Sequence, residues 1–142
     1  MLKGIDPLLS PDLLHVLASM GHGDDIALVD ALFPAVTNAQ RLIRLDGIDL
    51  ARASQAVLSV LHLDTFVEMP VATMAMVDTP EVIPEVQQEV FALANEAEGR
   101  EVPVEHLERF AFYERSRQAF AIVITGELRP YGNVIFRKGV GF

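Results

Sequence analysis

Short apolar runs alternate with amphipathic stretches along the whole chain. A continuous apolar run between turn residues is typical of a strand buried on both faces, whereas apolar residues three or four positions apart are typical of a helix packed on a sheet. The apolar runs predict strands over 26–29, 41–45, 71–77, 120–125 and 134–137. The helical spacing predicts helices over 11–20, 49–61, 84–98 and 108–118. This alternation predicts a single α/β domain over residues 1–142, with three α/β/α layers around a central, mostly parallel sheet.

Residues at the ends of the predicted helices support these boundaries. Ser10 and Pro11 place a capping hydroxyl and a proline at the start of the first helix, and Asp49 is the capping residue of the second. Gly21 and Gly99 follow the last apolar positions of two helices, where glycine commonly ends a helix.

The composition fits one domain that assembles with copies of itself. With 142 residues, 51% of them hydrophobic, the chain has more apolar side chains than one small core needs. We therefore expect a homo-oligomer in which neighbouring subunits cover the surplus. No run approaches the roughly 18 apolar residues of a membrane span, and no secretory signal is visible at the N-terminus. We expect a cytoplasmic protein without membrane partners.

Charge and cysteine content exclude several kinds of chemistry. The chain has no cysteine, which excludes disulfides, thiolate nucleophiles and cysteine-ligated metals. Its net charge of -9 disfavours nucleic acid and other polyanions as partners. A neutral ligand such as a sugar is compatible with this charge.

Polar side chains at the ends of predicted strands are the candidates for chemistry. Asp30 ends the first strand, at the edge where ligands collect in open α/β sheets. His22 lies just upstream between two glycines, and its residue type suits proton transfer. It could equally be an ordinary loop or capping residue. A metal site with Asp24, Asp25 and Asp30 is not expected, because zinc sites usually need more histidine or cysteine.

Two further polar segments are candidates of the same kind. Arg109 lies at the start of a predicted helix, where a cation opposes the helix dipole, so it either binds a ligand or pairs with Glu105 or Glu108. Tyr131 and Asn133 offer a phenol and an amide in a segment that reads otherwise as a plain turn between strands.

Two long stretches resemble a known enzyme family. These are GHGDDIALVDALFPA at 21–35 and ERFAFYERSRQAFAIVITGELRPYGNVIFRKGV at 108–140. Together with LKGIDPLLSPDLL near the start, they resemble the family of L-fucose mutarotases and D-ribose pyranases, which interconvert the ring and anomeric forms of free sugars. The chain is more similar to the fucose mutarotase branch, where GHGDE, RFAFYER, TGE and YGN recur.

The resemblance implies roles for specific residues. It implies that His22 is the general acid and that the sugar contacts Asp30, Arg109 and the triplet of Tyr131, Gly132 and Asn133. We add the hypothesis that Tyr131 is an opposing proton relay. Mutarotation requires no metal or other cofactor. The family forms ring-shaped decamers with active sites near subunit boundaries, so the resemblance implies a decamer here.

Two positions depart from the fucose mutarotase pattern. Leu32 stands where those proteins carry histidine or asparagine, and Pro130 precedes the YGN triplet. Because of Leu32, a D-ribose pyranase or a mutarotase of another aldose is an alternative. A second alternative is a non-catalytic sugar-binding accessory of an uptake system.

Overall fold

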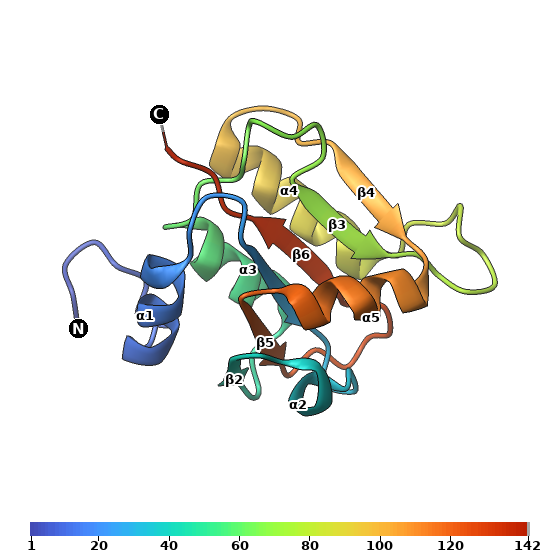
Figure 1. Cartoon of the computed structure of the whole chain (residues 1–142), viewed down its shortest axis with the longest axis horizontal. Helices are drawn as coiled ribbons and strands as arrows, with labels where there is room; N and C mark the ends of the chain where they lie inside the picture. The colour runs from blue at the N-terminus through green and yellow to red at the C-terminus, as the bar shows by residue number, and fades with distance from the viewer. Residues whose placement is uncertain (142) are drawn as a thin grey trace.

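The computed structural model describes residues 1–141, which form one six-stranded sheet with helices on both faces (Figure 1). The strands are β1 (Asp25–Val29), β2 (Leu42–Leu45), β3 (Val71–Met74), β4 (Val104–Leu107), β5 (Ala121–Thr125) and β6 (Val134–Arg137). The helices are α1 (Pro11–Ser19), α2 (Ala35–Asn38), α3 (Leu50–Leu58), α4 (Glu85–Glu98) and α5 (Arg109–Gln118). The predicted α/β fold with a mostly parallel sheet is confirmed.

The strands of the sheet lie in the order β2-β5-β1-β6-β3-β4, and β6 alone runs against its neighbours. β1 pairs in parallel with β5 and in antiparallel with β6, so it lies between two strands that follow each other in the chain. Residues 126–133 therefore do not form a hairpin but cross the end of β1. This crossing brings the end of β1 and the start of β6 to the same place.

The residues of β1 alternate between the two apolar layers. Ile26 and Leu28 pack with α1, α3 and α4, whereas Ala27 and Val29 pack with α2 and α5. Figure 1 shows α5 crossing in front of the sheet, with α3 and α4 behind it. Every residue from Ile26 to Val29 is fully buried, which explains why this strand reads as a continuous apolar run.

The structure contains two elements that the pattern does not predict, and it shortens two others. α2 is a single turn after Pro34, and β4 is an edge strand whose central residues, Glu105 and His106, are polar. An edge strand has one solvent-facing side, so it does not need an apolar run. β3 ends at Met74 and α3 at Leu58, each three residues before its predicted end. Among the described residues, no helix is long and apolar enough to cross a membrane.

Candidate active site

A cavity of about 270 Å³ lies at the carboxyl ends of β1, β3 and β4. Four of the predicted site residues line it, which are Asp30, Arg109, Tyr131 and Asn133. They come from three parts of the chain: Asp30 follows β1, Arg109 starts α5, and Tyr131 and Asn133 lie in the crossing segment before β6. The topology thus assembles the site, because the parallel strands end where β6 begins.

Asp30 and Asn133 form the floor of this cavity. The backbone N–H of Asp30 donates to Oδ1 of Asn133 at 2.9 Å, and Nδ2 of Asn133 donates to Oδ2 of Asp30 at 3.2 Å. The other carboxylate oxygen accepts the N–H of Leu32 at 3.0 Å. Burial raises the pKa of Asp30, and the hydrogen bonds from Leu32 and Asn133 oppose that rise. The result is a carboxyl group in a fixed orientation.

Tyr131 has a left-handed backbone, with φ of 62°, and is the one non-glycine residue with positive φ in the part of the chain that the structure describes. Its phenol oxygen accepts the N–H of Val77 at 3.2 Å. Because that oxygen already accepts a hydrogen bond, the phenolic proton remains available to a ligand. Tyr131 thus keeps a hydrogen-bond donor at the wall of the cavity.

Gly132 is required by close packing. A Cβ at this position would lie 2.9 Å from Cγ of Glu127, whose side chain is tied to Leu50 and Arg129. A larger residue would therefore push the triplet away from the body of the domain. The role of Gly132 in this geometry is to let Tyr131 and Asn133 approach.

Arg109 is free of the ion pairs that the sequence suggests as alternatives. The Glu108 carboxylate caps α5 by accepting the N–H groups of Phe110 and Ala111, and Glu105 pairs with Arg115 at 3.2 Å. Arg109 instead donates from Nε to the Tyr113 hydroxyl at 3.1 Å. This contact holds the guanidinium at the cavity wall with its other N–H groups available to a ligand.

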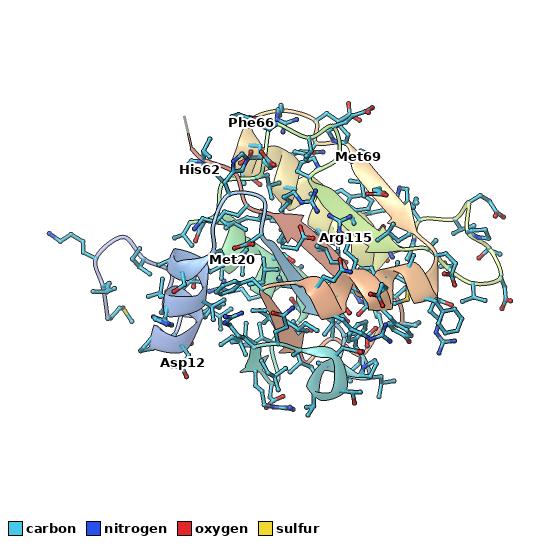
Figure 2. The ribbon with its side chains drawn as sticks, viewed as in Figure 1. Asp12, Met20, His62, Phe66, Met69 and Arg115 are labelled. Atoms are coloured by element: carbon cyan, nitrogen blue, oxygen red, sulfur yellow. The ribbon has the colours of Figure 1, made fainter. Side chains whose placement is uncertain are left out.

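His22 lies at the amino end of β1, at the other end of the strand from the cavity. It precedes β1, whose five residues span about 16 Å at the usual rise of a strand, whereas Asp30 follows β1. Its Nε2 lies 3.0 Å from Oδ1 of Asp64, and its ring meets the edge of Phe66 with centroids 4.8 Å apart. Figure 2 shows Phe66 at the upper end of the molecule, away from α2 and α5. Within one chain the structure therefore separates His22 from the other predicted site residues.

Asp64 is the residue that orients His22 in this chain. It is buried, and although burial opposes its ionisation, the N–H of Phe66 and the His22 ring lower the pKa of its carboxyl group. Sequence reasoning did not single out Asp64 or Phe66. Their only signal is an acid directly after Leu63 in HLDTF, which is too common to be specific. Over the described residues, no group of three or more histidine or acidic side chains could hold a metal ion.

Two buried residues behind the cavity were also missed. Gln87 lies on the core-facing side of α4 with Val90 and Ala94. A glutamine within an apolar stripe of a helix is the sequence feature that could have identified it. Glu127 belongs to the TGE phrase of the resemblance, which implies no role for it. Its carboxylate accepts from Leu50 N–H at 3.3 Å and from Arg129 at 2.9 Å.

The chain is similar over nearly its whole length to known proteins. An L-fucose mutarotase from Glaesserella parasuis is 48% identical over 140 residues, covering 99% of this chain and 96% of that protein. One from Actinobacillus pleuropneumoniae is 46% identical, covering 99% of this chain and 97% of that protein. The crystal structure of a Streptococcus pneumoniae fucose mutarotase in complex with L-fucose is 38% identical, with a TM-score of 0.92, covering 99% and 100% of the two chains.

A family match covers nearly the whole sequence. Residues 3–141 match the family described as the RbsD / FucU transport protein family. The full-length relatives carry the name L-fucose mutarotase, as expected from the GHGD, RFAF and YGN phrases. Motifs, fold and overall likeness point the same way, and the chain belongs to the RbsD / FucU family.

Proposed function

We propose that this protein is an L-fucose mutarotase, an isomerase that interconverts the anomers of the free sugar. The observation that carries the proposal is the gathering of a carboxylate, a phenol, a guanidinium and an amide around one cavity. These groups donate and accept hydrogen bonds in several directions, as a ligand with many hydroxyl groups requires. The full-length relatives named as L-fucose mutarotases support the choice of sugar.

Mutarotation needs a proton delivered to the ring oxygen and another removed from the anomeric hydroxyl. The ring then opens to the aldehyde, the bond to the carbonyl carbon rotates, and the ring closes on the other face. In our proposal His22 is the general acid, Tyr131 is the opposing proton relay, and Arg109 and Asn133 fix the sugar hydroxyls. Positioned acids and bases of this kind typically contribute about 10² to 10⁴ in rate.

Asp30 has a narrower role than the sequence suggests. Two roles were open for it, to orient His22 or to hold a sugar hydroxyl. Oδ1 of Asp64 lies 3.0 Å from Nε2 of His22, so His22 already has a carboxylate to orient it. We therefore assign Asp30 to holding a sugar hydroxyl. Its oxygens face the cavity from the end of β1, where an acceptor for a hydroxyl proton is useful.

We propose further that a second copy of the chain brings its His22 to this cavity. Exposed apolar side chains accompany both parts of the site: Leu32 is 89% exposed and Phe110 67% exposed near the cavity, and Phe66 is 70% exposed beside His22. Contact between these surfaces would bury them and complete the site. The resemblance suggests a ring of ten copies, which sedimentation analysis of the purified protein tests.

A mixing experiment tests the shared site. His22→Ala and Asp30→Ala are each expected to be inactive, but mixed oligomers of the two would contain intact sites built from the unmutated residue of each partner. Dissociating and reassembling an equal mixture should restore about a quarter of the wild-type activity. A mixture that stays inactive, although it assembles, would show that His22 does not act across subunits.

The activity itself is tested by NMR saturation transfer between the anomers of L-fucose, D-ribose and other aldoses. Accelerated exchange of L-fucose that is lost in His22→Ala supports the proposal. Faster exchange of D-ribose or another aldose would instead indicate a D-ribose pyranase or a mutarotase of that aldose. Leu32 at the cavity wall is the residue that makes this alternative worth testing. Saturable binding without acceleration would instead indicate a sugar-binding accessory.

A further inference from the structure

The side chain of Gln87 joins two walls of the cavity from behind. Gln87 is 1% exposed and lies in the first turn of α4. Its Nε2 donates to the carbonyl of Met74 at 2.7 Å and to the carbonyl of Tyr131 at 3.0 Å. Met74 ends β3 and Tyr131 belongs to the crossing segment, and both residues line the cavity. Gln87 itself does not line it.

Tyr131 needs such support because of its backbone. A φ of 62° is sparsely populated for a residue with a Cβ, and it persists where the surroundings hold it. Two contacts fix Tyr131 at its two ends: Val77 N–H binds the phenol oxygen, and Gln87 binds the carbonyl. A Cβ on the next residue, Gly132, would lie 3.4 Å from Cγ2 of Val86, the neighbour of Gln87 on α4. The first turn of α4 is thus the support on which this segment rests.

We propose that Gln87 is a positioning residue that holds Tyr131 in its donating orientation and fixes the distance between Tyr131 and Met74. The amide is suited to this task because its two N–H groups can serve two carbonyls at once. No charged side chain could do the same without burying a charge. The inference deepens the proposed function, on which the role of Tyr131 rests, but the packing that it describes does not depend on the sugar.

A fluorine NMR experiment tests the positioning directly. The chain has only two tyrosines, Tyr113 and Tyr131, so protein labelled with 3-fluorotyrosine should give two resonances, and Tyr131→Phe assigns them. In Gln87→Leu the Tyr131 resonance should shift or broaden while that of Tyr113 stays in place. Gln88→Leu is the matched control, because Gln88 donates to the exposed Ile83 carbonyl and should move neither resonance. An unmoved Tyr131 resonance in folded Gln87→Leu would overturn the proposal.

A double-mutant cycle separates positioning from general structural support. L-fucose affinity should fall about fivefold in Gln87→Leu, and by less than twofold when the same change is made in Tyr131→Phe, because coupled residues are not additive. Equal losses in both backgrounds would overturn the proposal. If the wild type does not bind L-fucose, the proposed function fails while the fluorine spectra still decide the role of Gln87. Gln87→Met keeps the side-chain length and replaces Gln87→Leu if that variant does not fold.

Discussion

Asp30 and Asn133 hold each other through two hydrogen bonds, one from the backbone N–H of Asp30 and one to its carboxylate. The two residues are far apart in the sequence, but the antiparallel pairing of β1 with β6 makes them neighbours. Both are buried, Asn133 at 3% and Asp30 at 8% exposed. Each residue therefore contributes to the fold as well as to the cavity.

Asn133→Ala should weaken both sugar binding and stability. It removes a donor and an acceptor from Asp30, and an unsatisfied buried polar group costs about 1–3 kcal/mol. We expect a loss of this size in urea unfolding, together with weaker L-fucose binding by calorimetry. Asn38→Ala is the matched control, because Asn38 is buried and hydrogen-bonded to Pro34 and Arg117 but does not line the cavity. Asn38→Ala should lower the free energy of unfolding but leave the affinity for L-fucose unchanged. An unchanged affinity in Asn133→Ala would exclude Asn133 from the site.

The Asp30 carboxyl group should titrate above the ordinary pKa of an aspartate, because burial raises its pKa. The folded state then holds this proton more tightly than the unfolded state. This group therefore makes the protein less stable as pH rises from the ordinary pKa of an aspartate through the raised pKa of Asp30. Carbon-13 NMR of the carboxyl carbons measures the midpoint, and Asp30→Asn identifies the signal. Asp46, whose pKa is lowered by Arg44, is the internal comparison. A midpoint for Asp30 at or below that of Asp46 would contradict the prediction.

Glu127→Gln should destabilise the protein at neutral pH but not in strong acid. Hydrogen bonding to Arg129 is the largest cause that lowers the pKa of Glu127 from 4.5 to about 2. The stabilisation is therefore fully present above pH 4.5 and is lost as pH falls towards 2, an effect of about 3 kcal/mol by linkage. Unfolding free energies of the wild type and Glu127→Gln, measured across this range, should converge. If the two unfolding free energies differed by the same amount at every pH, the charge of Glu127 would not be the cause of the stabilisation.

Leu32→Asn should change sugar preference with little effect on the fold. Leu32 is 89% exposed at the cavity wall, so its replacement should alter stability by less than about 0.5 kcal/mol. An amide there can bind a sugar hydroxyl, and we expect several-fold tighter L-fucose binding relative to D-ribose. Leu128→Asn is the control, since Leu128 is 81% exposed but does not line the cavity. An equal change in both variants would remove Leu32 from the determinants of specificity.

The sequence predicts those parts of the fold that depend on local burial. β1 was placed within one residue because it is buried on both faces, and the Ser10 and Asp49 caps bind the N–H groups expected of them. β4 was missed because an edge strand can be polar. The order of the strands depends on which segments pair across the whole chain, and no local pattern encodes that pairing.

The same distinction applies to the site. Asp30 and Asn133 could be named from strand ends and from the resemblance, but their contact depends on the insertion of β1 between β5 and β6. His22 is close to Asp30 in sequence, yet a straight strand keeps them apart. The sequence does not single out Gln87, because Gln87 donates to the carbonyls of Met74 and Tyr131, which are distant in the chain. Composition does not reveal such contacts.

The central position of β6 affects how the chain folds during synthesis. β6 is the last strand in chain order, yet it alone joins β2, β5 and β1 on one side to β3 and β4 on the other. Because residues 134–137 are synthesised after the other five described strands, those strands can form only two partial sheets, with unpaired facing edges, until β6 joins them. Such edges are open to pairing with other chains. The insertion of β6 is therefore the step that removes both open edges, and until it occurs the chain is exposed to aggregation.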